Sequence, residues 1–446
     1  MAYRRIRRIV ASDIKLATTV TVIEAKNTRV LACAVMKPND VRFALPTLLL
    51  GASLVGASLT ALSCSDSSDD TGSNNNDLNN ADASTSDSGD NNTNPVSIDP
   101  TRLLSFAPLP KVMWPAEGDS NNRLLFQKKV DLGKQLYFDT RLSKNNDISC
   151  NSCHLLDQYG VDGQPVSDGT NADKTATPPH GNRNAPTVYN AALHLWQFWD
   201  GRAEDVEAQA LGPILNPVEM GMKDEQEVLA VINSIDGYVT EFAAAFPPED
   251  LNATGKDPNE NTTPVSYINI GKAIGAFERT LVTPSRWDAY LNGDKNALTA
   301  AELAGLAKFM EVGCDTCHNG VAMGGRGFDL LGETNAWPWP GHPNADGYEE
   351  IGRADVTNDD ADKYVFKVPS LRNVEKTGPY FHDGSVTTLE EAVNKMAYYQ
   401  LGKTLSSDDV ASIVTFLKAL TGDLDDATIT KPTPLPGKDD GGGTTL

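Results

Sequence analysis

The chain has 446 residues, 40% of them hydrophobic, which suffices for two or three folded domains of roughly 150 residues and excludes a wholly disordered protein. Its formal charge of −22 repels phosphate backbones and anionic headgroups, which argues against nucleic-acid binding. Six cysteines are too few for a disulfide-stapled scaffold of this length, so their spacing carries the information.

The first apolar segment, residues 43–63, is an uncharged run that ends directly before Cys64. Basic residues precede it and small residues lead to the cysteine, as in a bacterial lipoprotein signal peptide. We therefore expect residues 36–63 to be a signal peptide and Cys64 to be acylated, so that a lipid anchor tethers the protein in the periplasm. A retained transmembrane helix is the alternative. Because Met36 precedes the run, we interpret residues 1–35 as an extension upstream of the true start.

Two segments have compositions that do not favour a packed core. Residues 64–100 are rich in Ser, Asp, Asn and Thr and contain almost no large apolar residue, so burial cannot offset the entropy of ordering. We expect a disordered tether there. Residues 426–446 contain Pro and Gly clusters and are expected to form a flexible tail. The folded part is then residues 101–425.

Apolar residues three and four apart predict a largely helical folded part. The predicted helices cover residues 122–138, 203–211, 223–235, 265–281, 299–312, 388–399 and 406–421. Thr299 precedes Glu302 at the spacing of a capping box, and Ser406 precedes two acids of a first turn. Long connections rich in Gly, Pro and Asn lie between the helices, as expected for loops that wrap a flat cofactor.

Four of the six cysteines form two copies of the motif Cys-x-x-Cys-His. The copies are Cys150, Cys153 and His154, and Cys314, Cys317 and His318. In each, two thiols are spaced to add to the vinyl groups of one haem, and the histidine is placed to ligate its iron. A zinc site would need further cysteines or a histidine pair at finger spacing, and a redox dithiol would need a βαβ context. The motifs therefore predict two covalently bound haem c groups.

A haem iron with one histidine ligand has a sixth position, whose occupant decides between electron transfer and peroxide chemistry. The remaining candidates are His180, His194, His342, His382, Met113, Met220, Met222, Met310, Met323 and Met396. The residue types alone do not select one of them.

The sequence closely resembles the bacterial dihaem cytochrome c peroxidases, a family that includes the MauG proteins. The resemblance covers about residues 105–425 and is carried by both haem motifs and by four strings in the family's order. These are RNAPTVYNAALHLWQFWDGRAEDVEAQALGP (183–213), NPVEM (216–220), FERTLVTPSRWDAYLNGDKNAL (277–298) and VPSLRNVEKTGPYFHDGSVTTLEEAV (368–393). It implies a mainly α fold with two cytochrome c-like domains, an N-terminal peroxidatic haem domain (101–284) and a C-terminal electron-transfer haem domain (285–425).

The resemblance implies that hydrogen peroxide is reduced at the N-terminal haem, with electrons entering at the C-terminal haem from a small periplasmic cytochrome c or copper protein. Met396 matches the family's axial ligand of the electron-entry haem, and thioether sulfur raises the reduction potential. MauG proteins have Tyr in that role, so Met396 favours a peroxidase, although Tyr398 and Tyr399 keep a MauG-like oxidase open. A non-enzymatic electron carrier is a third alternative.

For the peroxidatic site, the resemblance assigns the family's catalytic Gln and Glu to Gln197 and Glu207. Peroxide cleavage needs a base that moves a proton between the two oxygens, and a carboxylate in a dry pocket suits that task. Without the resemblance, Glu207 would be interpreted as part of a solvated helix face. His180 matches the histidine that occupies the sixth position of the oxidised peroxidatic haem. Its loop is shorter than in familiar members, so either this ligand is displaced or the site is permanently open.

The family also binds a calcium ion between its domains. Asn184, Thr377 and Pro379 match its protein ligands, the last two through backbone carbonyls, and oxygen donors of this kind suit hydrated Ca²⁺. Electron passage between the haems is expected to use an aromatic residue, with Tyr189, Trp196 and Trp199 as the candidates. Homodimerisation is a further implication of the resemblance.

Overall fold

The computed structural model describes residues 98–111, 113, 123–173, 175–247, 263–339 and 348–437. The predictions for residues 1–35, for the signal peptide and for Cys64 lie outside the described residues, as does nearly all of the predicted tether. Among the described residues no single helix is long and apolar enough to cross a membrane, and one sharply bent pair of helices passes the same test of length and composition.

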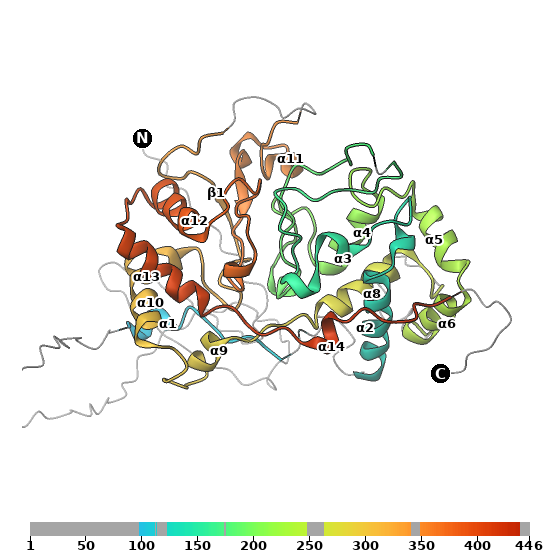
Figure 1. Cartoon of the computed structure of the whole chain (residues 1–446), viewed down its shortest axis with the longest axis horizontal. Coiled ribbons are helices and arrows are strands. Elements are labelled where there is room, and N and C mark those ends of the chain that lie inside the picture. The colour runs from blue at the N-terminus through green and yellow to red at the C-terminus, as the bar shows by residue number, and fades with distance from the viewer. Residues whose placement is uncertain are drawn as a thin grey trace, which may run out of the picture. The chain divides into compact units, whose positions relative to one another are not determined.

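The described part is mainly helical, which confirms the predicted fold class at this level (Figure 1). Its α-helices are α1 (Pro100–Leu103), α2 (Arg123–Tyr137), α3 (Cys150–Cys153), α4 (Val206–Leu215), α5 (Glu225–Asn233), α6 (Asp236–Ala245), α8 (Tyr267–Glu278), α9 (Arg286–Leu291), α10 (Ala300–Val312), α11 (Ala354–Thr357), α12 (Leu389–Lys395), α13 (Ser407–Lys418) and α14 (Asp426–Ile429). Strands β1 (Phe328–Leu330) and β2 (Val365–Lys367) pair antiparallel, with Phe328 opposite Lys367. The predicted capping box of α10 is present, with Thr299 and Glu302 bonded reciprocally.

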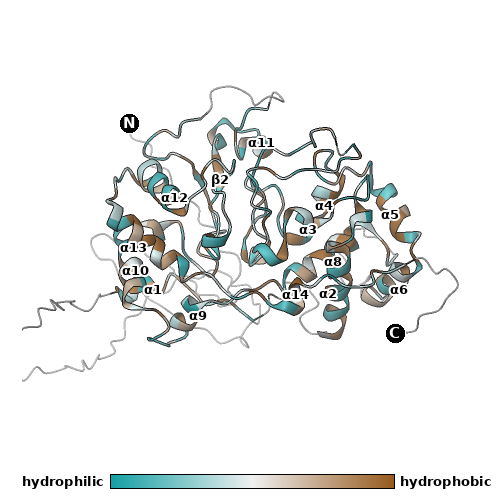
Figure 2. Ribbon diagram, in the orientation of Figure 1, coloured by the Kyte–Doolittle hydropathy of each residue, from teal (hydrophilic) through white to brown (hydrophobic). Residues whose placement is uncertain are grey.

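The first hydrophobic core is formed mainly by α2, α4, α5, α6 and α8. Its closest packing is between α2 and α8, where a side chain at Gly133 would place its Cβ 1.8 Å from the carbonyl oxygen of Ala273. Only glycine allows the two backbones to approach so closely. Figure 2 shows that these helices carry polar as well as apolar residues, as amphipathic packing around a core requires.

The second hydrophobic core is formed mainly by α9, α10, α12 and α13. Trp287 is completely buried at its centre and meets Phe106 and Phe416 edge to face. Gly305 allows α10 to pack directly on α13, because a Cβ there would lie 2.1 Å from the carbonyl oxygen of Ser412. The division into two haem domains remains a prediction, although the two cores agree with it.

Both ends of the described chain pack against the core of the opposite half. Phe106 belongs to the second core, although it lies in the predicted first domain. Ile429 packs against the first core from α14, a short helix inside the segment expected to be a flexible tail. The helix forms because Asp425 caps it by accepting a hydrogen bond from the Thr428 backbone N–H.

Candidate active site

The first Cys-x-x-Cys-His motif lies on α3 and places its histidine at the helix end. Nδ1 of His154 lies 3.3 Å from the carbonyl oxygen of Gly160. Because a carbonyl only accepts hydrogen bonds, Nδ1 carries the proton and Nε2 is available to a metal ion. Burial lowers the pKa of His154, which favours the neutral imidazole that binds iron.

The second motif repeats this arrangement after α10. Gly313 ends that helix in the left-handed region at φ 97°, which turns the chain into the motif. Nδ1 of His318 lies 3.3 Å from the carbonyl oxygen of Met323, so its Nε2 is available in the same way. Burial also lowers the pKa of His318. Both histidines are therefore oriented as haem ligands.

The four thiols do not have the properties of a redox dithiol. Burial raises the pKa of Cys153 and of Cys317 to about 11 and that of Cys314 to about 12, and the pKa of Cys150 is raised as well. Reactive dithiols need the opposite shift. Among the described residues no group of three or more His, Cys, Asp or Glu side chains is arranged to hold a metal ion. The geometry therefore does not support the zinc and dithiol alternatives.

The first motif lines a cavity of about 470 Å³, here called the first cavity. Cys150, Cys153 and His154 contribute to its wall, together with Gln209 and Glu219. The volume is in the range of ligand and cofactor sites in proteins. A carboxyl group, an amide and the histidine of the first motif are thus gathered around one cavity.

Gln209 and Glu219 reach the first cavity from α4 and from the turn that follows it. Asp205 caps α4 by accepting a hydrogen bond from the Ala208 backbone N–H, 2.8 Å away. The backbone of Glu219 is fixed by a 2.7 Å bond from the Thr170 N–H to its carbonyl oxygen. Burial raises the pKa of the Glu219 carboxyl group, against a lowering by the nearby charge of Arg202. A partly buried acid of this kind is suited to proton transfer.

Glu207 is not among the residues that line the first cavity. Both oxygens of its carboxylate are bound by Arg279, with Nε–Oε1 and Nη2–Oε2 distances of 2.6 and 2.8 Å. Two residues correspond to about 200° around an α-helix, so Gln209 faces the cavity while Glu207 faces α8. Gly275 makes room for it, since a Cβ there would lie 2.7 Å from Cγ of Glu207. In this structure Glu219 lines the first cavity and Glu207 does not, and the acid–base role of Glu207 stays a prediction.

A sequence signal for Glu219 was present in the string NPVEM. An acid that stands between Pro217 and the buried Met220, in an otherwise apolar turn after a helix, is a better candidate for a dry pocket than an acid on an amphipathic helix. Gln209 could be recognised only once the orientation of α4 was known.

The structure separates the other two predicted peroxidatic residues. Gln197 is buried and lines the first cavity, where its Nε2 donates a hydrogen bond to the carbonyl oxygen of Ala191 at 3.0 Å. His180 is exposed, its Nδ1 lies 3.0 Å from the carbonyl oxygen of Gly181, and it does not line the cavity. The exposed position of His180 agrees with both alternatives for the short loop, and its role as a sixth ligand stays a prediction.

Glu278 is a further acid of the first cavity that the sequence analysis did not identify. It ends α8, is 4% exposed and lines the cavity. Burial raises its pKa to about 8, and the neighbouring charge of Glu207 adds to the shift. Glu278 therefore carries its proton near neutral pH.

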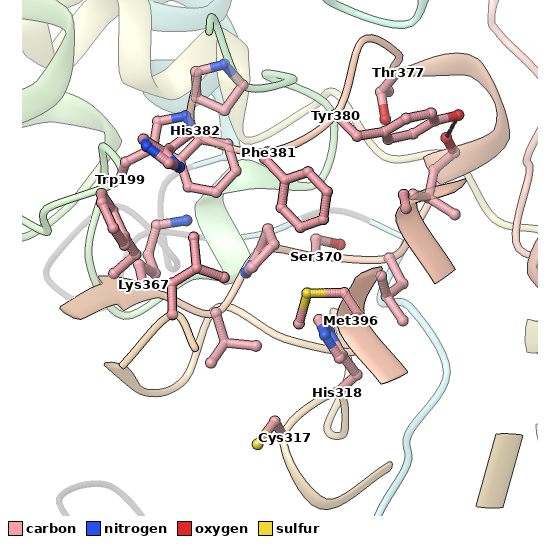
Figure 3. A pocket seen from close by; sticks show the side chains of 18 of the residues that line it. Trp199, Cys317, His318, Lys367, Ser370, Thr377, Tyr380, Phe381, His382 and Met396 are labelled. Atoms are coloured by element: carbon pink, nitrogen blue, oxygen red, sulfur yellow. Dashed lines mark hydrogen bonds between the residues drawn. The ribbon is translucent and has the colours of Figure 1, made fainter. Parts of the chain in front are cut away.

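The second motif lines a cavity of about 230 Å³, here called the second cavity. His318 and Met396 both line it, and Figure 3 shows the thioether of Met396 beside the imidazole of His318, with Cys317 nearby. Met396 begins a π-helical turn, Met396–Gln400, that continues α12. This placement suits the predicted axial role of Met396.

The second cavity also contains polar atoms that match the carboxylates of a haem. Lys367 is only 5% exposed, and its ammonium group forms no ion pair with a carboxylate among the described residues. Its Nζ lies 3.3 Å from Nδ1 of His194, whose buried Nε2 has no hydrogen-bond partner. A haem c carries two propionates, so a buried cation and an unpaired donor fit that group. The first cavity fits a haem through its thiols and histidine.

Asn184, Thr377 and Pro379, the predicted calcium ligands, all line the second cavity. The Asn184 side-chain amide donates to the carbonyl oxygens of Gln164 and Pro165 at 2.8 and 3.3 Å. A role in calcium binding stays a prediction.

Of the three candidate aromatic residues, Trp199 alone lines both cavities. Its indole N–H donates to the carbonyl oxygen of Asn184 at 2.9 Å. Tyr189 is buried in the first core, and Trp196 packs on Phe328 with ring centroids 4.9 Å apart. Trp199 is therefore the candidate that connects the two sites.

Comparison with known proteins agrees with this geometry. The family model for di-haem cytochrome c peroxidase matches residues 127–296. The cytochrome c551 peroxidase of Nitrosomonas europaea is 45% identical over 298 residues, which cover 67% of this chain and 81% of that protein. The cytochrome c551 peroxidase of Pseudomonas aeruginosa is 42% identical, over 71% of this chain and 84% of that protein.

Among solved structures, a MauG-like protein associated with microbial copper homeostasis matches with a TM-score of 0.56 and 30% identity, covering 74% of this chain and 98% of that one. With these relatives and two Cys-x-x-Cys-His cavities, the chain belongs to the family of dihaem cytochrome c peroxidases.

Proposed function

We propose that the protein is a c-type dihaem peroxidase that reduces hydrogen peroxide to water at the first cavity. Electrons would enter at the second cavity from a small periplasmic cytochrome c or copper protein. The observation that carries the proposal is that Gln209 and Glu219 line the same cavity as His154, while Met396 lines the same cavity as His318. The names of the two cytochrome c551 peroxidases support it.

When bound, the haem of the first cavity would supply an iron that binds peroxide and exchanges electrons with it. Glu219 would accept the proton of the peroxide oxygen nearer the iron and return it to the farther oxygen, which leaves as water. Gln197, to which the resemblance assigns this task, would orient the peroxide by hydrogen bonding, and the Gln209 amide lines the same cavity. Overall, H₂O₂ takes up two protons and two electrons and forms two water molecules.

The second cavity has a different donor set. His318 and Met396 would both hold its iron, and a thioether ligand would raise the reduction potential, which suits electron entry. Trp199 would connect the two haem sites, since it lines both cavities. The division of tasks thus follows from which side chains face each cavity.

Three further properties form part of the proposal. The exposed position of His180 supports a first cavity that reacts with peroxide without prior reduction. Asn184, Thr377 and Pro379 would bind a calcium ion at the second cavity. Export to the periplasm, the lipid anchor at Cys64 and a homodimer rest on the sequence and on the family resemblance.

A direct test of the proposal is a titration of the fully reduced dihaem protein with hydrogen peroxide, followed by the absorption spectra of the two haems. We expect one peroxide to oxidise both haems, because each gives one electron. If peroxide leaves both haems reduced, or bleaches them without this stoichiometry, the proposed activity is wrong.

A MauG-like oxidase acting on Trp or Tyr of a partner protein is the second candidate, favoured by the 47% exposure of Tyr398 and by the similarity to the MauG-like structure. A spectrum without a Met-to-iron charge-transfer band would favour it. A non-enzymatic electron carrier would bind neither cyanide nor peroxide in the reduced state.

A further inference from the structure

Six side chains form a continuous series of ring contacts from the surface to the region between the two cavities, here called the aromatic run. The successive centroid distances are 5.0 Å for Tyr398–Tyr399, 4.9 Å for Tyr399–Trp337, 6.4 Å for Trp337–Trp339, 5.6 Å for Trp339–His382 and 6.4 Å for His382–Trp199. Two members of the run, Trp199 and His382, are drawn in Figure 3, where they line the second cavity.

The two ends of the aromatic run differ in environment. Trp199 lines both cavities, whereas Tyr398 is 47% exposed. Between them Trp337 and His382 are only 6% and 4% exposed. The run therefore leads from the wall of both cavities to solvent through rings that are buried or half-buried.

Backbone hydrogen bonds hold the outer part of the aromatic run in place. The backbone N–H groups of Thr334 and Asn335 both donate to the carbonyl oxygen of Tyr399 at 3.1 Å. The Asn335 side-chain amide donates to the carbonyl oxygen of Tyr398 at 2.8 Å. The segment that carries Trp337 is thereby fixed to the π-helical turn that carries both tyrosines. A fixed arrangement matters because electron tunnelling weakens steeply with distance.

Phe366 reinforces the central step of the run. It stacks on His382 with a centroid distance of 4.5 Å and lies 6.1 Å from Trp339. Neither imidazole nor phenyl rings lose an electron readily, so this part would be crossed by tunnelling between Trp199 and Trp339. Trp and Tyr are the side chains that lose one electron most readily.

We propose that the aromatic run carries oxidising equivalents from Trp199 to Tyr398 when no external donor supplies electrons. The inference rests on the proposed peroxidase function, because peroxide is the oxidant. Each exposed tyrosine would give up one electron and its phenolic proton and become a phenoxyl radical. Two tyrosines reduce one peroxide, H₂O₂ + 2 Tyr–OH → 2 Tyr–O• + 2 H₂O, so that atoms and electrons balance.

The radical would stay at Tyr398 because this phenol is in contact with water, which accepts its proton. Two such radicals on separate molecules couple through a new carbon–carbon bond between their rings and give dityrosine, with no further oxidant. The run would in this way move unused oxidising equivalents to the surface and prevent oxidation of the side chains around the haems.

The experiment uses the full dihaem protein mixed with hydrogen peroxide in the absence of any reductant. Dityrosine fluorescence and covalent dimers on denaturing gels report coupling, and electron paramagnetic resonance of rapidly frozen samples reports the phenoxyl radical. Peroxide consumption is measured in the same samples. The variants are Tyr398→Phe, which removes the terminal phenol, and Trp339→Phe, which interrupts the run while keeping a ring.

Tyr290→Phe is the matched control, because Tyr290 stacks on Trp287 in the second core and is outside the run. We expect radical and dityrosine in the parent protein and in Tyr290→Phe, and a fall to background in Tyr398→Phe and Trp339→Phe. An unchanged dityrosine yield in Tyr398→Phe, with normal peroxide consumption, overturns the inference while leaving the proposed function intact. If the parent protein consumes no peroxide, the proposed function is wrong, and this inference, which rests on it, is wrong as well.

Discussion

Arg279 binds both carboxylate oxygens of Glu207, with Nε–Oε1 and Nη2–Oε2 distances of 2.6 and 2.8 Å. The pair joins the end of α8 to the first turn of α4, and its side chains are only 12% and 18% exposed. A carboxylate engaged in this way is a structural link between helices. Glu219, which lines the first cavity, is in contrast placed to exchange a proton with a ligand.

Exchange of the two acids for glutamine should therefore have opposite effects. We expect Glu219→Gln to lower the turnover number by roughly 10² to 10⁴, because the proton shuttle is lost, while both haem spectra stay unchanged. Glu207→Gln should retain most of the turnover but lower the free energy of unfolding by about 1–3 kcal/mol, since Arg279 loses a charged partner. Steady-state assays and denaturant titrations of both variants decide this. The reverse pattern would return the catalytic role to Glu207.

The pH dependence of turnover gives a second test of Glu219. Burial raises its pKa, and the base must be ionised to accept a proton from peroxide, so turnover should rise with pH through a pKa above the ordinary value of 4.5. Glu219→Gln should lack this acid limb, whereas Glu207→Gln should retain it. If the fall in turnover at low pH is unchanged in Glu219→Gln, another group is responsible for it.

Glu278 should make the protein less stable as the pH rises. Its folded-state pKa is raised from 4.5 to about 8, so between these values the folded state binds more protons than the unfolded state. The free energy of unfolding then falls with increasing pH, by at most about 1.4 kcal/mol per pH unit. Guanidinium titrations at several pH values in this range should show a free energy of unfolding that varies less with pH in Glu278→Gln than in the parent protein. Equal slopes would show that the carboxyl group is ionised in the folded state.

Much of the fold followed from local patterns. The 3.6-residue period and the capping box at Thr299 each depend on a few neighbouring residues, and the seven predicted helices are present with ends shifted by a few residues, whereas α6 and α9 were not predicted. Met396 required the family resemblance, because a methionine on an amphipathic helix is usually packed in a core. The structure then placed it in the cavity of His318.

The residues that line the first cavity were harder to predict, since they meet through tertiary packing. Gln209 and Glu207 are two residues apart on one helix, and only the position of α8 decides which of them faces the cavity. His194 and Lys367 are far apart in sequence and are joined by a 3.3 Å contact that no local pattern reveals.

Lys367 should raise the reduction potential of the second haem, because a buried cation beside that cavity stabilises the form with one electron more. We expect Lys367→Met to lower this potential by the equivalent of about 1 kcal/mol, roughly 40 mV for a one-electron couple. Lys363→Met is the control, since Lys363 is 46% exposed and pairs with Asp360 at the surface. Spectroscopic redox titrations measure the reduction potential of the second haem in each variant. Equal potentials in the two variants would show that Lys367 does not influence the haem.

The central claim is that this chain uses electrons from a small donor protein to reduce hydrogen peroxide. Its most direct test is the steady-state oxidation of a reduced small cytochrome c by hydrogen peroxide, measured with and without prior reduction of the enzyme and with and without Ca²⁺. We expect two donor molecules to be oxidised for each peroxide, with turnover also in the enzyme that was not reduced beforehand. No turnover under any of these conditions would contradict it.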